Sequence, residues 1–360
     1  MDSLNFLSSK QTLFSNPDAL DLDFVPKLLP HREGQQKYIA TAVQPLFAGR
    51  SGKNLLIRGT SGIGKTAATK RVLMDLDETD GNVSWVFINC WKHDSTFKIL
   101  TEVCHALGFK FTHNMNSTQI LDKVKEISEK RDGVVFAFDE IDKINDTDFL
   151  YLILEEIKKK AVILITNDKS WGAGLDNRIK SRLAPEILEF NEYNPEEIKS
   201  ILRERRKYAF YENVWDENAF NLIADKAAQY SDVRVGIILL KTACEIAEAA
   251  ASRKVKPEHA QKAIANTDAF KIKSSSDMTD DEKAVLEIVK QNSGKTTGEL
   301  FDFYTQAGGN KSMKTFTRHL QKLETKKLVS MELTGEGFQG RSSVIKYIGF
   351  EKKLADFSTQ

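Results

Sequence analysis

The sequence carries the run Gly59-Thr60-Ser61-Gly62-Ile63-Gly64-Lys65-Thr66, which fits the pattern G-x-x-x-x-G-K-[ST]. It follows an apolar segment typical of a buried strand, Leu55 to Ile57, and opens a segment typical of a helix. Such glycines let backbone amides converge on phosphates, while Lys65 would neutralise the β- and γ-phosphates and the Thr66 hydroxyl would ligate Mg²⁺. The expected nucleotide-binding residues are therefore Gly59, Thr60, Ser61, Gly62, Ile63, Gly64, Lys65, Thr66 and Ala67.

An acidic pair ends a second apolar run. Val134 to Phe138 has the composition of a buried strand, and Asp139 and Glu140 follow it. Asp139 would hold Mg²⁺ through water, and Glu140 would orient or activate the water that attacks the terminal phosphate. An apolar run that ends in Asp-Glu is often only a strand cap, but the catalytic interpretation is favoured beside a phosphate loop.

A third polar strand end is predicted at Asn167, after the apolar run from Val162 to Ile165. The Asn167 amide could reach the γ-phosphate or the attacking water between the two strand ends. A turn-forming role for a single Asn at this position is equally compatible with the sequence.

Short apolar segments alternate with helical periodicity between residues 54 and 190, after a first helix that begins near His31. This order predicts an α/β fold with a parallel sheet covered by helices on both faces. The expected strands are Asn54–Arg58, Trp85–Asn89, Val134–Phe138, Ala161–Thr166 and Glu186–Phe190, and the expected helices are Lys65–Asp77, Thr96–Leu107, Thr118–Lys130 and Phe149–Lys158.

The strand signals end at Asn194-Pro195, and a purely helical segment follows to about Thr267. The Ser-rich segment from Lys271 to Asp277 has the composition of a linker. A third unit after it has three helical segments and then two strands around a Gly-rich loop, the outline of a winged helix. Its expected elements are Asp280–Gln291, Thr297–Gln306, Ser312–Lys326, Val329–Leu333 and Ser343–Ile348.

The composition of the 360 residues excludes several classes of protein. Hydrophobic residues make up 41% and charged residues 29%, as in ordinary globular proteins. No apolar run approaches the roughly 18 residues of a membrane span, and neither a basic leader nor a secretory signal is evident, so we predict a cytoplasmic protein without a membrane partner. Three distant cysteines predict neither a disulfide framework nor a zinc site. With 52 basic and 51 acidic residues the chain has almost no net charge, so a nucleic-acid partner would have to bind a local cluster of basic residues.

Taken in order, the phosphate loop, the acidic pair, Asn167 and the following helical segment resemble an AAA+ ATPase, and more closely the archaeal and eukaryotic origin-recognition initiators of the Orc/Cdc type. The motifs that carry the closer resemblance are His31-Arg32-Glu33, Leu56-Ile57-Arg58-Gly59, Phe87-Ile88-Asn89-Cys90, Leu175-Asp176-Asn177-Arg178-Ile179-Lys180-Ser181-Arg182-Leu183 and Ser231-Asp232-Val233-Arg234. The resemblance implies an AAA+ nucleotide-binding domain, a helical lid and a C-terminal winged helix, with ATP or ADP and Mg²⁺ as cofactors. The expected boundaries are residues 1–30 for an extended arm, 31–193 for the AAA+ base, 194–270 for the lid and 277–350 for the winged-helix domain.

The resemblance also implies residues that contact the bound nucleotide. Arg234, early in a lid helix, would contact the γ-phosphate and report ATP against ADP by lid rotation; a solvated helix start is the alternative. The arginine finger offered to a neighbouring subunit corresponds to Arg182, with Arg178 as the competitor, and either could instead pair with an acid of its own domain. His31 and Arg32 would border the adenine pocket.

The winged helix has the local charge that the whole chain lacks. The segment from Lys311 to Lys346 contains eight Lys or Arg and three Glu, whereas Asp277 to Asp302 contains seven acids and three lysines. Helical periodicity buries Phe316, Leu320 and Leu323. The expected DNA contacts, to phosphates or bases, are Lys311, Ser312, Lys314, Thr315, Arg318 and Arg341, the last in the wing. Lys322 is a further expected phosphate contact.

The resemblance implies a DNA replication initiator with slow, switch-type ATP hydrolysis. It would bind origin repeats in duplex DNA on the nucleoid, and its further partners would be other initiator subunits and the replicative helicase. The helical insertion by which such initiators contact origin DNA has no Pro and Gly signals here between Phe109 and Ile127, so DNA contact by the ATPase domain is not implied. The alternatives are a mobile-element ATPase and a regulatory NTPase whose winged helix docks protein or binds DNA without sequence preference.

Overall fold

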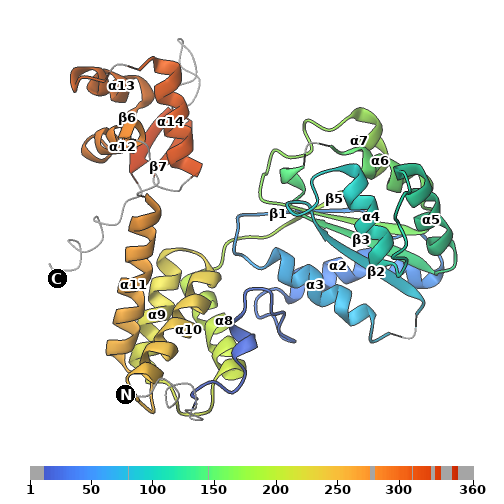
Figure 1. The fold of residues 1–360 in the computed structure, drawn as a ribbon, viewed down its shortest axis with the longest axis horizontal. Helices are drawn as coiled ribbons and strands as arrows, with labels where there is room; N and C mark the ends of the chain where they lie inside the picture. The colour runs from blue at the N-terminus through green and yellow to red at the C-terminus, as the bar shows by residue number, and fades with distance from the viewer. Residues whose placement is uncertain are drawn as a thin grey trace. The chain divides into compact units, whose positions relative to one another are not determined.

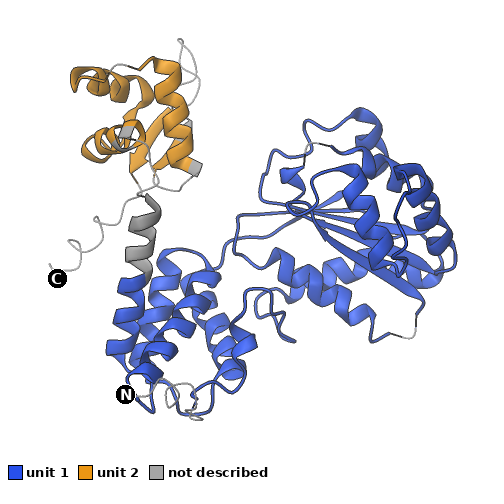
Figure 2. Ribbon diagram, viewed as in Figure 1, with its two compact units in different colours: residues 1–267 blue, residues 268–360 orange. Residues whose placement is uncertain are grey.

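The structure is a computed structural model of the chain and describes residues 12–79, 81–144, 146–275, 280–309, 311–325, 329–333 and 343–347. The chain forms two compact units, residues 1–267 and residues 268–360 (Figure 2). Within the described residues, the first unit holds a parallel sheet and a bundle of helices, and the second holds the end of the helix Pro257–Ser275, three further helices and a small antiparallel sheet.

Five parallel strands form the sheet of the first unit, in the order β2-β3-β4-β1-β5. Their bounds are β1 Leu55–Arg58, β2 Val83–Asn89, β3 Gly133–Asp139, β4 Lys160–Thr166 and β5 Glu186–Glu189. The inner strand β3 is buried along its whole length, as expected for a strand covered on both faces. Because β4 lies between β1 and β3, the carboxyl ends of these three strands are neighbours at one edge of the sheet.

Side chains of β1 alternate between two cores. Leu55 and Ile57 join the core that includes residues of α2 (Glu33–Val43) and α3 (Lys65–Leu76). Leu56 joins the other core, with α4 (Thr96–Ala106), α5 (Ser117–Glu129) and α6 (Asp148–Glu156). Figure 1 shows these two groups of helices on opposite sides of the sheet, so the predicted parallel sheet with two covered faces is confirmed.

The strands and helices of this region lie within two residues of the expected positions. One helix was not expected: α7, Asn177–Leu183, begins at Asp176, whose carboxylate accepts a hydrogen bond of 2.7 Å from the backbone N–H of Arg178. At seven residues it is too short for its hydrophobic period to be recognised.

Four helices form the lid: α8 (Pro195–Ala209), α9 (Glu217–Gln229), α10 (Val233–Ala249) and α11 (Pro257–Ser275). A capping box starts α8, in which Asn194 and Glu197 each accept a backbone N–H of the other at 2.9 Å. The expected linker is wrong over residues 271–275, because α11 continues to Ser275; residues 276 and 277 lie outside the described part. Serine lowers helix stability only modestly, so a short Ser-rich run does not by itself end a helix.

Residues 12–30 pack on the lid. Phe14 forms a β-bridge with Phe210, and the 3₁₀ turn Pro17–Leu20 buries Ala19 and Leu20. This part of the expected arm is therefore folded against other residues, and residues 1–11 lie outside the described chain.

The second unit contains α12 (Asp280–Gln291), α13 (Thr297–Gln306) and α14 (Met313–Thr325), with a sheet in the order β6-β8-β7. Its strands are β6 Lys295–Thr296, β7 Val329–Leu333 and β8 Ser343–Tyr347. Phe316, Leu320 and Leu323 are fully buried in its core, as the periodicity predicted. Three helices with an antiparallel sheet have the winged-helix arrangement; the two-residue β6 was not predicted, and the Gly-rich loop lies outside the described residues. None of the helices that the structure describes is long and apolar enough to cross a membrane.

Candidate nucleotide site and nucleic-acid interface

The phosphate loop joins the end of β1 to the start of α3. Gly62 and Gly64 have φ angles of 82° and 87°, in the left-handed region that side chains disfavour. A Cβ on Gly62 would lie 2.4 Å from a carboxylate oxygen of Asp232, and one on Gly64 would lie 2.9 Å from the Tyr193 hydroxyl. The loop therefore needs glycine for its conformation and for the close approach of these two residues. The free amides at the start of α3 make it suitable for phosphate.

Lys65 is buried in this loop, with 6% of its surface exposed. Its ammonium group donates to the carbonyls of Gly59 at 2.8 Å and Thr60 at 2.7 Å, and to Oδ1 of Asn167 at 2.7 Å. Burial, only partly offset by Asp139, lowers the pKa of Lys65 to about 8. The predicted lysine and the predicted strand-end asparagine thus lie in direct contact.

Thr66 and Asp139 also lie together, because β3 ends beside the start of α3. The Thr66 hydroxyl donates to Oδ2 of Asp139 at 2.7 Å, and Asp139 is 5% exposed. Burial raises the pKa of Asp139, and the hydrogen bond from Thr66 opposes that rise. A hydroxyl beside one carboxylate fits Mg²⁺, which takes few protein ligands and completes its shell with water and phosphate oxygens.

Glu140 follows β3 with a φ angle of 53°, an unusual value for a residue with a side chain. Its backbone N–H donates to Oδ1 of Asp139 at 2.9 Å, and its side chain is half-buried. Left-handed backbone at a residue other than glycine costs free energy and is common at functional sites. The residue with this unusual backbone conformation is the one whose carboxylate is predicted to act on water.

Asp142 belongs to the same site and was not predicted from the sequence. Its carboxylate accepts from the Thr166 hydroxyl at 3.0 Å, from the backbone N–H of Asn167 at 3.2 Å and from Lys143 at 2.8 Å. Burial acts to raise the pKa of Asp142, but these hydrogen bonds lower it overall. Asp142 therefore holds the end of β4 that carries Asn167. The available signal was a third acid in the run, three residues after Asp139.

Arg234 reaches the phosphate loop from the first turn of α10. Its guanidinium lies 3.2 Å from the Ser61 hydroxyl and 2.7 Å from the carboxylate of Asp232. The hydrogen bond that the Arg234 guanidinium donates to Asp232 raises the pKa of Arg234. Asp232 also accepts the backbone N–H of Arg234 and so caps α10. The structure thus brings the predicted lid arginine onto the loop.

The two finger candidates both lie on α7 and pair within their own domain. Arg182 forms an ion pair with Glu155, and Arg178 lies 3.1 Å from Asp176. Both guanidinium groups also face the ring of Tyr151, at 5.1 Å for Arg182 and 5.6 Å for Arg178. These contacts correspond to the alternative role considered for each arginine and do not separate the two.

A hollow of ≈ 330 Å³ adjoins the Thr66–Asp139 pair. Its remaining lining comes from residues 12–30, α3, β2, the segment after β2, and α4. They are Asp23, Lys70, Phe87, Ile88, Asn89, Lys92, His93 and Glu102. The predicted Mg²⁺ ligands therefore face open space.

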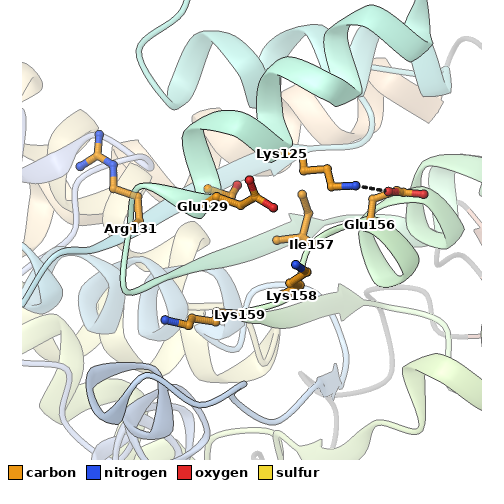
Figure 3. A pocket seen from close by; sticks show the side chains of 8 residues that line it. Lys125, Glu129, Arg131, Glu156, Ile157, Lys158 and Lys159 are labelled. Atoms are coloured by element: carbon orange, nitrogen blue, oxygen red, sulfur yellow. Dashed lines mark hydrogen bonds and ion pairs between the residues drawn. The ribbon is translucent and has the colours of Figure 1, made fainter.

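A hollow of ≈ 400 Å³ lies at the opposite edge of the sheet (Figure 3). Arg131 precedes β3 and Lys159 precedes β4, so parallel strands place this hollow at their amino ends. Its charges partly compensate one another, as in the 2.8 Å ion pair of Lys125 with Glu156. It contains none of the predicted site residues and is separate from the phosphate loop.

All of the predicted DNA contacts of the second unit except Arg341 lie in and just before α14. Lys314 and Arg318 are exposed one turn apart, and neither forms an ion pair with any residue that the structure describes. The Ser312 hydroxyl accepts the backbone N–H of Thr315 at 3.4 Å, and their hydroxyls lie 3.2 Å apart.

Two further lysines, one just before α14 and one within it, form ion pairs with acidic residues of α12. Lys311 lies 3.2 Å from Asp281, and Lys322 lies 3.1 Å from the buried carboxylate of Glu282. The acidic and basic ends of this unit, separate in the sequence, thus partly meet in the fold. Arg341 lies outside the described residues.

Known proteins resemble this chain over most of its length. Residues 49–168 match the AAA domain family, and residues 199–265 match the family described as the Cdc6 AAA+ ATPase-type lid domain. The ORC1-type DNA replication protein 1 of Sulfurisphaera tokodaii is 31% identical, over 94% of this chain and 90% of that protein. The protein of the same description from Archaeoglobus fulgidus is also 31% identical, over 97% and 91%. The Aeropyrum pernix ORC1 protein, solved in complex with DNA, has the same fold, with a TM-score of 0.68 and 23% identity over 94% of both chains.

Proposed function

Because this chain belongs to the ORC1-type family of DNA replication proteins, with an AAA+ domain and a Cdc6-type lid, we propose that it is an ATP-dependent replication initiator. Its winged helix would bind duplex DNA, and its nucleotide state would set its conformation and assembly. The observation that best supports a nucleotide-dependent change of conformation is the 3.2 Å contact between Arg234 of the lid and Ser61 of the phosphate loop.

The site supports binding of ATP or ADP with Mg²⁺. Residues 59–67 would surround the phosphates, with Lys65 as the cation, and Thr66 and Asp139 would hold the metal. Bound Mg²⁺ would neutralise charge that develops on the phosphates. Glu140 would orient the attacking water and accept its proton, while Asn167, held by Lys65 and Asp142, would fix the position of that water or of the γ-phosphate.

Slow hydrolysis fits a switch better than a motor. Arg182, with Arg178 as the alternative, would complete the site of a neighbouring subunit, and a single chain lacks that contribution. Arg182 would have to break its ion pair with Glu155 before it could take this role. Assembly with other initiator subunits would therefore set the hydrolysis rate.

On the DNA side, Lys314 and Arg318 supply exposed cations on α14, and Ser312 and Thr315 supply short polar groups. Lys311 would have to exchange Asp281 for a phosphate, and Arg341 would act from the wing. We propose origin repeats in duplex DNA as the target, the replicative helicase as a further partner, and the nucleoid as the location.

The proposal is tested by footprinting the full-length protein on the DNA that flanks its own gene, with ATP and with ADP. We expect protection of a repeated sequence and tighter binding than to random duplex of equal length at physiological salt. A specific site is usually bound at least about 10³-fold more tightly than random sequence. Equal affinity for both DNAs would contradict an origin-binding role and favour the mobile-element or regulatory alternatives.

Arg318→Ala is expected to weaken duplex binding and to lower the slope of log K against log salt by about one, because one phosphate contact is lost. The measurement is fluorescence anisotropy on a labelled duplex over a series of salt concentrations. Lys98→Ala is the control, since Lys98 is an exposed lysine of α4 that pairs with Asp94. An unchanged slope in Arg318→Ala would show that α14 does not face DNA and would favour a protein-docking winged helix.

A further inference from the structure

Two segments of chain connect the base to the lid, and Arg32 lies where they meet. The first is residues 12–31, which run from the lid to the start of α2. The second is residues 190–194, between β5 and α8. Arg32 directly precedes α2, and only 4% of its surface is exposed.

The first segment is fastened to lid helices. The backbone N–H of Leu13 donates to the Glu248 carboxylate at 2.7 Å, and Arg205 donates to the carbonyl of Ala19 at 2.9 Å. The turn Pro17–Leu20, with Ala19 and Leu20 buried, packs against α8 and α10. This segment would therefore move with the lid.

Arg32 bonds the phosphate loop to the second segment. Its Nε donates to the carbonyl of Ile63 at 3.0 Å, and its Nη2 donates to the carbonyl of Asn191 at 2.7 Å. The guanidinium lies 3.8 Å from the centre of the Tyr193 ring and 5.2 Å from that of Phe190. Its Nη1 donates to the carbonyl of His31 at 3.2 Å, so one planar cation touches the loop and both connections to the lid.

The contacts of Arg32 depend on one another. Arg32 forms no ion pair with any residue in the described part of the chain, and burial lowers its pKa. A buried guanidinium is tolerated only while its donors are satisfied. A shift of the Ile63 carbonyl would leave Nε without an acceptor unless the residues held by Nη2 moved as well.

We propose that Arg32 is a positioning residue that couples the phosphate loop to the lid. The inference rests on the proposed function, since ATP must occupy the loop. Adjustment of the loop around a γ-phosphate moves the Ile63 carbonyl, and Arg32 passes that shift to Asn191 and to the lid-bound segment 12–31. Arg234 would contact the phosphate from the lid, and Arg32 would couple the movement of the phosphate loop to residues 190–194.

The test is hydrogen exchange of residues 190–194 in the full-length protein, with a non-hydrolysable ATP analogue and with ADP. In the wild type we expect the two nucleotides to give exchange rates that differ by about fivefold, the factor that corresponds to one hydrogen bond of ordinary strength. In Arg32→Lys, which keeps the charge but loses the planar fork, the difference should vanish when each nucleotide is supplied at a saturating concentration. The control is Arg206→Lys, whose guanidinium packs on Phe220 and pairs with Glu217 inside the lid.

If Arg32→Lys binds both nucleotides and keeps the difference, the coupling role is wrong. If that variant binds neither, Tyr193→Leu replaces it, because this change removes the stacking but keeps the bond from Arg32 to Ile63. Loss of the difference in Tyr193→Leu supports the coupling, and its persistence overturns it. A wild-type protein that binds no ATP would overturn the proposed function itself, which is a separate result.

Discussion

The Lys65→Ala protein is expected to fold and to bind ATP more weakly by a factor of about 10²–10³. The Lys65 ammonium donates to three oxygen atoms in a buried site, and phosphate oxygens would take over such bonds. Removing one member of a buried, charge-assisted pair costs about 3–4 kcal/mol, which is the same factor in affinity. Isothermal calorimetry with ATP and Mg²⁺ measures the loss.

Lys160→Ala is the matched control for Lys65. Lys160 is half-buried, and burial lowers its pKa as it lowers that of Lys65, but Lys160 lies at the start of β4, at the far edge of the sheet. Its replacement should leave ATP affinity unchanged. Equal affinities for Lys65→Ala and wild type would refute the assignment of the loop.

The low pKa of Lys65 adds a pH dependence to the same measurement. With a pKa of about 8, the free protein loses this charge as the pH rises through 8. Phosphates favour the charged form, so ATP binding then requires uptake of a proton, and affinity should fall above that pH. The fall should be absent from Lys65→Ala.

Glu140→Gln is expected to retain ATP and to hydrolyse it at least about 10²-fold more slowly, the usual contribution of a general base. Glutamine has the same size and can occupy the same strained backbone, but it cannot accept a proton from water. Single-turnover hydrolysis gives the rate, and the nucleotide content of the purified protein shows whether ATP is kept.

Glu156→Gln is the control for Glu140, because Glu156 is a glutamate of α6 paired with Lys125 at the other edge of the sheet. It should hydrolyse ATP at the wild-type rate. A wild-type rate in Glu140→Gln would remove Glu140 from the mechanism and leave the proton acceptor unassigned.

The sheet could be predicted because its signals are local. An apolar run between polar turns is typical of a buried strand. The glycine pattern of the phosphate loop indicates a strand–loop–helix unit without further information. Boundaries failed where no local signal exists: α7 is short, β6 has two residues, and α11 continues through serines that a linker also uses.

The fold class, the order of the elements and the types of side chain at the ends of β1, β3 and β4 can be predicted from the amino-acid sequence, because periodicity and motif spacing are properties of short segments. Contacts between distant groups are visible in the folded chain alone. Asp142 holds Asn167, Asp232 directs Arg234 onto Ser61, Glu282 neutralises Lys322, and Arg32 binds two carbonyls from separate parts of the chain. Such contacts depend on backbone carbonyls and carboxylates brought together by packing, and no spacing in the sequence encodes that approach.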